Sequence, residues 1–159
     1  MATTTFSGPV VSTAGFISGP ASLNPITTAT IDLTTGEYAG RTVVLNRAAG
    51  QAVTLPPAVA SGNTYRFFVL TSITSNTTTI KVTGNDTMAG MAIFANDTDA
   101  SASIFETAAD TDTITFNGST TGGLIGAMVE LTDVSLDLWA VIVHSAATGS
   151  EATPFSATV

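Results

Sequence analysis

Short stretches of apolar or alternating residues recur along most of the chain. Their spacing, roughly 8 to 12 residues, is typical of the strands of an all-β sandwich or barrel. In residues 113–116, Ile114 and Phe116 share one face of an extended chain, and the threonines beside them share the other. This stretch ends at Asn117-Gly118, a strong turn signal. The predicted strands are residues 41–46, 52–55, 64–70, 78–83, 90–94, 103–105, 113–116, 124–131 and 136–143.

The last two predicted strands, 124–131 and 136–143, carry apolar side chains on both faces. Strands of this kind are covered on both sides, and in a chain of this size the second cover can be a partner subunit. The only helix that we expect is a short one within residues 100–109. The sequence therefore predicts an all-β fold, with a β-sandwich or jelly-roll-like body over residues 32–149 and a small-residue tail over residues 150–159.

Residues 1–31 follow a different pattern. They contain three prolines and no charged residue, and Ser-Gly-Pro occurs twice, at 7–9 and 18–20. This density of proline and glycine argues against a long helix or a central strand, whereas a solvated disordered tail is usually polar and charged. We therefore expect an extended N-terminal arm that lies on its own domain, a sister subunit or another protein, with a floppy terminus as the alternative. Its candidate contact residues are Phe6, Pro9, Val10, Phe16, Ile17 and Pro20.

Charged residues make up only 10% of the 159-residue chain, which has a formal net charge of -8. Its four basic side chains are too few to build the cationic patch that binding to nucleic acid or to an anionic membrane surface requires. No apolar run approaches the roughly 18 residues of a membrane-spanning helix. Cysteine is absent, which removes disulfides, thiolate catalysis and Cys-ligated metal sites. We therefore expect no nucleic-acid or membrane partner.

A glycine-rich stretch, residues 116–126 with the sequence FNGSTTGGLIG, has the glycine content of a phosphate-binding loop. A Walker loop needs a lysine that reaches the phosphates, and the single lysine of this chain, Lys81, is distant in sequence. The residues that follow read as a strand, whereas phosphate loops lead into a helix N-terminus. We therefore interpret the stretch as a hairpin connection between strands. Gly122 and Gly123 would serve tight turning and close backbone approach, and they are candidate subunit-contact residues.

The side chains that could act in catalysis or bind a metal occur in few recognisable patterns. His144 is the only histidine and lies beside Ser145, but no nucleophile-elbow motif accompanies them, and a lone histidine cannot build a zinc site. We therefore expect no catalytic residue and no bound cofactor. Four loop acids offer oxygen ligands in an alternating pattern, so a calcium site is one hypothesis and a solvated acidic surface is the other. These acids are Asp97, Asp99, Asp110 and Asp112.

Two longer stretches resemble structural proteins of tailed bacteriophages, in particular head decoration (cement) proteins. They are GRTVVLNRAAGQAVTLPPAVASGNTYRFFV, residues 40–69, and TITFNGSTTGGLIGAMVELTDVSLDLWAVIVHSAATGSEATPF, residues 113–155. The resemblance implies a β-sandwich that trimerises on the outer surface of the capsid and bridges neighbouring major capsid proteins. It also draws attention to the Ala-Thr-Pro-Phe tail, whose Pro154 and Phe155 are further candidate contact residues.

The main alternative is a receptor- or carbohydrate-binding module of a phage fibre, and an enzyme such as a depolymerase comes third. Sugar binding needs exposed aromatic rings for stacking. Trp139 and Tyr65 lie within predicted strands, so we expect them in the core. The sequence and the resemblance together predict a non-enzymatic structural protein of the virion, located on the outer surface of the capsid.

Overall fold

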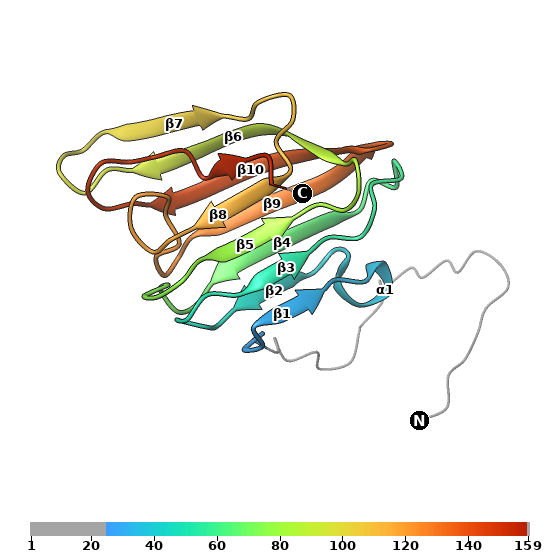
Figure 1. The fold of residues 1–159 in the computed structure, drawn as a ribbon, viewed down its shortest axis with the longest axis horizontal. Coiled ribbons are helices and arrows are strands. Elements are labelled where there is room, and N and C mark those ends of the chain that lie inside the picture. The colour runs from blue at the N-terminus through green and yellow to red at the C-terminus, as the bar shows by residue number, and fades with distance from the viewer. Residues whose placement is uncertain (1–24, 159) are drawn as a thin grey trace, which may run out of the picture.

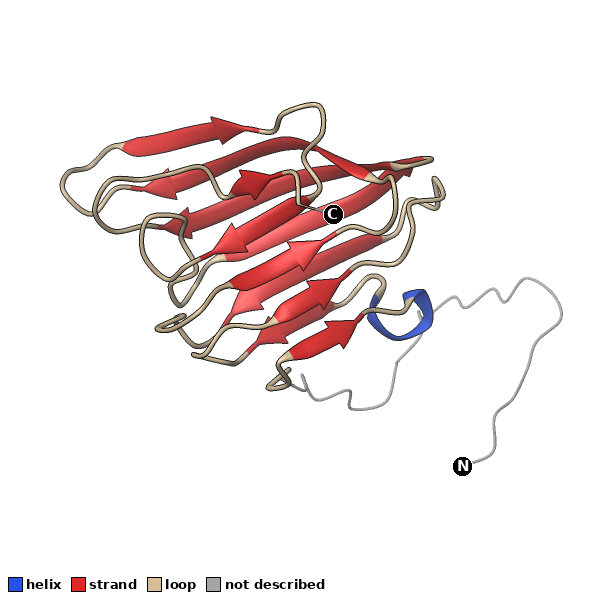
Figure 2. Ribbon diagram, in the orientation of Figure 1, coloured by secondary structure: helices blue, strands red, loops and turns tan. Residues whose placement is uncertain are grey.

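Two β-sheets packed face to face form the part of the chain that the computed structural model describes, residues 25–158 (Figure 1). The five-stranded sheet has the order β1-β3-β5-β8-β11, and the six-stranded sheet has the order β2-β4-β9-β10-β6-β7. The prediction of an all-β sandwich is confirmed (Figure 2). The strands are β1 (Thr30–Asp32), β2 (Thr42–Leu45), β3 (Ala52–Thr54), β4 (Thr64–Val69), β5 (Thr78–Lys81), β6 (Thr87–Ala95), β7 (Ala102–Glu106), β8 (Thr113–Phe116), β9 (Met128–Ser135), β10 (Leu138–Ala146) and β11 (Phe155–Ser156). The candidate arm contacts Phe6, Pro9, Val10, Phe16, Ile17 and Pro20 lie outside the described residues.

The first five strands alternate between the two sheets. β1, β3 and β5 are parallel neighbours in one sheet, and β2 and β4 are parallel neighbours in the other. The chain therefore winds around the core here, in contrast to the antiparallel Greek keys of a jelly roll. Ile26 precedes this winding at the edge of β2, where its amide donates to Val44 O at 2.8 Å and its carbonyl accepts from Asn46 N at 2.9 Å.

The single helix of the described residues is the one-turn α1 (Thr35–Tyr38). The helix predicted within residues 100–109 is wrong, because β7 occupies the middle of this segment. Burial there alternates with a period of two residues: Ile104 is exposed, whereas Phe105 turns inward and packs edge-on against Phe94, with the ring centroids 5.5 Å apart. Within the described part of the chain, no helix is long and apolar enough to cross a membrane.

Inward side chains of both sheets meet in one hydrophobic core. In the five-stranded sheet, Val53, Ile80 and Ile114 lie side by side in register and are fully buried. The six-stranded sheet contributes Tyr65 and Trp139, whose rings form a T-shaped pair with centroids 5.6 Å apart. Because the two sheets share this core, any functional difference between them must lie in their outward side chains or at their edges.

The C-terminal tail is part of the sandwich. β11 pairs with β8 and places Phe155 opposite Ile114. Pro154 and Phe155 are both buried, so these two candidate contact residues pack inside the protein. The carboxylate of Asp112 accepts hydrogen bonds from Thr158 N at 2.8 and 3.0 Å, which fixes the end of the tail. With β1 and β11 included, the sheets extend beyond residues 32–149 at both ends.

Candidate protein-interaction surface

The six-stranded sheet leaves apolar side chains exposed on its outward face. Side chains alternate across a strand, so the inward Leu131 of β9 is fully buried while the outward Met128 is 48% exposed. On β10 the inward Val143 is fully buried while the outward Ile142 is 49% exposed. Both strands therefore do carry apolar side chains on two faces, but within one copy of the described chain only the inner face is covered.

Strand registers join these outward side chains into two rows across the sheet. One row runs from β9 to the edge strand β7 through Met128, His144, Ile93 and Ile104. The neighbouring row runs through Glu130, Ile142, Met91 and Glu106. We call these two rows the outer apolar face. Met91 is 43% exposed and Ile104 is 63% exposed, with Glu130, His144 and Glu106 beside them in the same rows, and exposed apolar side chains grouped on one sheet face make a candidate interaction site.

A shallow hollow of about 170 Å³ lies at the β9 end of the outer apolar face. Its lining includes Arg66 of β4, Met128 and Glu130 of β9, and Ile142 and His144 of β10. Arg66 Nε lies 2.6 Å from Glu130 Oε2, so the two charges neutralise each other. Both partners are well exposed, and such a pair contributes only about 0 to 1 kcal/mol to stability. The hollow therefore combines apolar walls with a neutral ion pair at one side.

A second group of exposed apolar side chains lies at one end of the sandwich. Val59 is 62% exposed and pairs with Leu136, which is 68% exposed, through an isolated bridge. Leu136 occupies the tight turn between β9 and β10 together with Asp137, whose φ is +58°. Val134, an outward residue of β9, is 49% exposed. This group continues the apolar character of β9 to the end of the strand.

The buried carboxylate of Asp133 fixes the loop that carries Val59. Its oxygens accept hydrogen bonds from Val59 N at 3.1 Å, Ala60 N at 2.8 Å, Ser61 N at 2.9 Å and Ser61 Oγ at 2.6 Å. Burial by itself raises the pKa of Asp133, but the hydrogen bonds from Ser61, Val59 and Ala60 outweigh it and hold the pKa below its ordinary value. The exposed Val59 therefore stands on a well-anchored loop.

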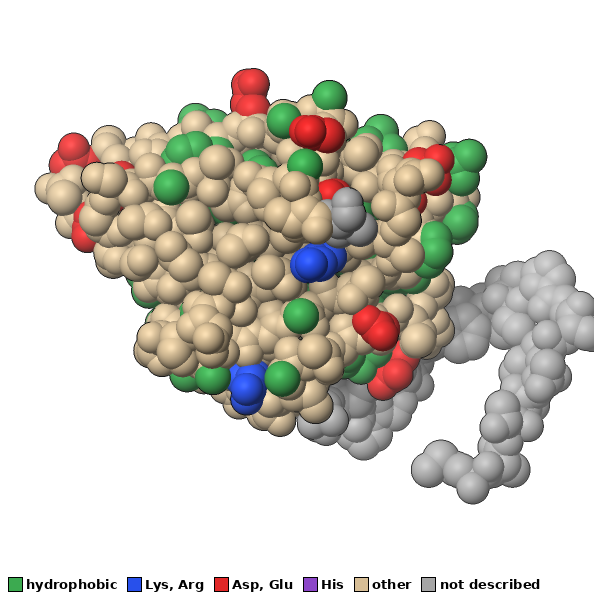
Figure 3. Space-filling view, viewed as in Figure 1, with side chains coloured by type: hydrophobic (Ala, Val, Ile, Leu, Met, Phe, Trp, Pro, Cys, Tyr) green, Lys and Arg blue, Asp and Glu red, His purple; other side chains and the backbone are tan. Residues whose placement is uncertain are grey.

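The outward side chains of the five-stranded sheet are of a different kind. One row contains Thr30, Ala52, Thr79 and Thr115, and the next contains Asp32, Thr54, Lys81, Ser156 and Thr113, which is buried and bonded to Thr158. We call these rows the threonine face. Figure 3 shows the molecule from this side, where most of the surface is neither hydrophobic nor charged and the acidic side chains lie mainly toward the periphery. Apart from the buried Thr113, short hydroxyl side chains keep this face polar, so it resembles an ordinary solvated sheet surface.

The glycine-rich stretch 116–126 is not the hairpin connection that its Asn-Gly pair favours. β8 belongs to the five-stranded sheet and β9 to the six-stranded sheet, so this segment crosses from one sheet to the other. Both edges of β8 are already paired, with β5 and β11. Asn117 forms a local turn instead, because its Oδ1 accepts hydrogen bonds from Ser119 N at 2.8 Å and Thr121 N at 3.1 Å.

Gly122 and Gly123 are buried within this crossing segment. A Cβ atom on Gly122 would lie 2.6 Å from Ser145 Oγ, and one on Gly123 would lie 2.6 Å from Phe116 Cβ. Their φ angles of +76° and +90° are also unfavourable for residues with a side chain. The structure thus places both glycines at close approaches inside their own chain, and a larger residue there would disturb folding before it disturbed a subunit contact.

The loop acids form no metal site in the described residues. Asp97 Oδ2 accepts a hydrogen bond from Gly149 N at 3.2 Å, and Asp99 Oδ1 accepts one from Ser101 N at 2.9 Å. The hydrogen bonds from the Ser101 side chain and backbone hold the pKa of Asp99 below its ordinary value. No group of three or more His, Cys, Asp or Glu side chains comes together in residues 25–158. The calcium hypothesis for Asp97, Asp99, Asp110 and Asp112 therefore finds no ligand cluster.

His144 and Ser145 project to opposite sides of β10. His144 lies on the outer apolar face and lines the hollow. Ser145 Oγ, on the other side, accepts from Gly123 N at 3.2 Å and donates to Ala146 O at 2.9 Å. A catalytic pair needs its nucleophile and base to converge on one point, and these two neighbours diverge.

Trp139 and Tyr65 are 1% exposed, which confirms that they belong to the core. Trp139 Nε1 donates to Asp86 Oδ2 at 3.3 Å, and the same oxygen accepts from Ala58 N at 2.7 Å. Among residues 25–158, the large apolar side chains that are exposed are all aliphatic or methionine. That part of the surface therefore presents no exposed aromatic platform on which a sugar ring would stack.

Comparison with known proteins yields no match to any family model, curated protein or solved structure. The structure alone therefore gives the class of protein, which is an all-β sandwich with the threonine face on one side and the outer apolar face on the other. Sequence reasoning detected the second apolar side of β9 and β10, but it did not connect Met91 and Ile104 with them. Their strands are neighbours in the sheet but distant in the chain, so only the register reveals the common surface.

Proposed function

We propose that this protein is a non-enzymatic structural protein of a tailed bacteriophage, which binds the outer surface of the capsid as a trimer and cements neighbouring major capsid proteins. The resemblance of residues 40–69 and 113–155 to head decoration proteins motivates the proposal. The observation that carries it is the outer apolar face, a broad group of exposed Met and Ile side chains that a monomer in water does not need.

A cementing role requires extended contact on a stable frame. A protein that binds only the assembled shell stabilises the shell by mass action, without any chemical step. The sandwich supplies a stable frame through its single core, and the exposed Val59, Val134 and Leu136 at one end of the sandwich supply contact area outside the outer apolar face. The net charge of -8 suits the outside of a capsid, away from the packaged DNA.

The test is a decoration assay. Purified full-length protein is added to phage heads that lack it, the bound copies are counted by quantitative gel analysis, and heat-induced release of DNA is followed by dye fluorescence. We expect saturable binding in multiples of three per lattice position and DNA release at a higher temperature. Absence of saturable binding would contradict the proposal, and specific signals on a glycan array would favour a carbohydrate-binding module instead.

The predicted arm has a separate test. We expect deletion of residues 2–20 to abolish capsid binding while the remaining chain keeps the circular dichroism spectrum of a folded β-protein. Decoration at full occupancy by the shortened chain would contradict the role of the arm, and it would leave the cementing role of the sandwich in place.

A further inference from the structure

We infer that the outer apolar face is the contact between copies of this chain, with Ile104 of one copy seated in the hollow of the next. The inference rests on the proposed function for the number of copies, three. What it adds is the identity of the two surfaces that meet.

Both halves of the contact lie along one register row. Ile104 stands on the edge strand β7 with 63% of its surface exposed, and Met128 borders the hollow at the other end of the row. The hollow measures about 170 Å³. A cavity of roughly 150 Å³ engineered into another protein holds a benzene molecule, so this hollow has room for an isoleucine side chain.

Ile104 and the hollow lie at different places on the same face, and this separation determines the symmetry of the contact. β7 and β9 are three strand spacings apart, about 14 Å at roughly 4.8 Å per spacing. Two different parts of one face then meet head to tail, and a head-to-tail contact closes into a ring when the rotation per copy divides a full turn. With three copies, the sheets stand as the sides of a triangular prism and their outer apolar faces point toward the axis.

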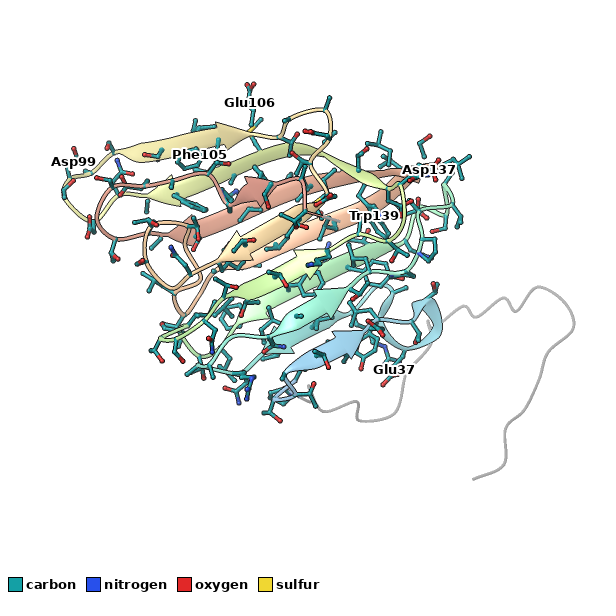
Figure 4. All side chains as sticks on the ribbon, in the orientation of Figure 1. Glu37, Asp99, Phe105, Glu106, Asp137 and Trp139 are labelled. Atoms are coloured by element: carbon teal, nitrogen blue, oxygen red, sulfur yellow. The ribbon has the colours of Figure 1, made fainter. Side chains whose placement is uncertain are left out.

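The charge distribution favours a second copy as the occupant of this face. Each copy carries a formal net charge of -8, so two copies repel unless their contact avoids the acids. In the described residues, the charges on or beside this face are the paired Arg66 and Glu130, and Glu106 on β7, and the polar His144 lies in the row that ends at Ile104. Figure 4 shows Glu37, Asp99, Glu106 and Asp137 around the rim of the sandwich. The contact would therefore contain two carboxylates of each copy, Glu106 and Glu130, and Arg66 neutralises Glu130, so most of the acidic side chains of the two copies stay outside it.

Engineered cysteines report the contact directly, because the natural chain has none. The full-length chain is made with Ile104→Cys and Met128→Cys together, treated with a mild oxidant and analysed on a non-reducing gel. We expect covalent trimers from this double variant and no cross-link from either single variant. A disulfide within one copy is excluded by distance, because bridged residues have Cα atoms within about 7 Å of each other.

Each other outcome overturns the inference in a recognisable way. Covalent dimers from Ile104→Cys alone would reveal a two-fold contact between β7 edges. A protein that is trimeric by light scattering but forms no cross-link would use another surface, and the proposed trimer would stand. A protein that is monomeric by light scattering would overturn both this contact and the trimer, while the decoration assay would still decide whether the monomer cements capsids.

A second measurement does not depend on cross-linking chemistry. We expect Ile104→Glu to raise the concentration at which half of the trimers dissociate by about tenfold or more, because a central apolar contact is replaced by a charge. Thr79→Glu places the same charge on the threonine face and serves as the matched control, with no shift expected. Sedimentation measures both, and circular dichroism verifies that both variants fold. Equal shifts in the two variants would overturn the inference.

Discussion

The threonine face and the outer apolar face cover opposite sides of the same core, yet their outward residues have little in common. On the five-stranded sheet the outward positions hold side chains such as Thr79 and Thr115, whereas the six-stranded sheet holds Met91 and Ile142 at equivalent outward positions. Threonine is β-branched and suits a strand, and its hydroxyl group keeps the surface hydrated. Strand formation therefore does not require apolar outward residues, and their presence on one sheet alone indicates a contact rather than a folding need.

The inward rows of the two sheets pack into one core, and substitutions in these rows are expected to have the largest effect. Ile114 of β8 and Leu131 of β9 are both fully buried. We expect Ile114→Ala and Leu131→Ala each to lower the free energy of unfolding by about 2 to 5 kcal/mol, because each leaves a cavity in the shared core. Urea unfolding followed by the fluorescence of the single tryptophan measures both. A large loss in one sheet and almost none in the other would show that the sheets do not share one core.

The segment that joins the two sheets gives the next effect. In Gly123→Ala the new Cβ would overlap Phe116 Cβ at 2.6 Å, and the residue would keep a φ near +90°. We expect a loss of about 2 to 4 kcal/mol, from backbone strain and overpacking together. Gly126→Ala is the matched control, because Gly126 has a φ of +92° but no atom within 4 Å of the new Cβ. Equal losses in the two variants would show that packing against β8 contributes nothing.

Asp133 anchors the loop that carries Val59, in the second group of exposed apolar side chains at the end of the sandwich. Asn lacks one of the two acceptor oxygens, so we expect Asp133→Asn to lower the free energy of unfolding by about 1 to 3 kcal/mol at neutral pH. The pKa of Asp133 is lowered in the folded state, so its stabilising contribution is complete above the unfolded pKa of about 3.9 and is lost as the pH falls through the folded value.

The difference between the wild-type protein and Asp133→Asn should therefore shrink when urea unfolding is repeated at about pH 3. The other acids are common to both proteins, so they cancel in this difference to first order. A difference that stays constant from neutral to acid pH would show that the charge of Asp133 does not contribute to holding the loop.

Much of the sandwich can be predicted from the sequence because its strands alternate with a period of two. Residues 113–116 were expected as a strand and form β8 with those bounds. Residues 103–105 were expected as a strand and also lay within the short helix expected in residues 100–109; the strand is confirmed as part of β7, and the helix is wrong, because the partly buried Ser103 and Phe105 of this edge strand give only a weak apolar period. The hairpin predicted for the glycine-rich segment is wrong for another reason. Asn-Gly favours a turn, but whether the next strand pairs with β8 depends on which edges of β8 are already paired.

The candidate surface was predictable only in part. The sequence reveals that β9 and β10 are apolar on both sides, and this signal is local to residues 124–143. Met91 and Ile104 can be assigned to the same surface only when the parallel pairing of β10 with β6 is known. This pairing joins residues about 50 positions apart in the chain. The burial of Gly122, Gly123, Pro154 and Phe155 likewise follows from packing between the sheets, which no local pattern encodes.

The smallest effect on stability comes from exchanging the character of the two faces. Thr79 and Ile142 point outward from opposite sheets, and Ile142 is 49% exposed. We expect Thr79→Ile and Ile142→Thr each to change the free energy of unfolding by no more than about 1 kcal/mol, because neither residue lies in the core. Retention of the dissociated monomer on a hydrophobic-interaction column should move in opposite directions, longer for Thr79→Ile and shorter for Ile142→Thr. Unchanged retention of Thr79→Ile would show that the outward side chains alone do not determine how hydrophobic each face is. The difference between the two faces would then have to come from what covers each face.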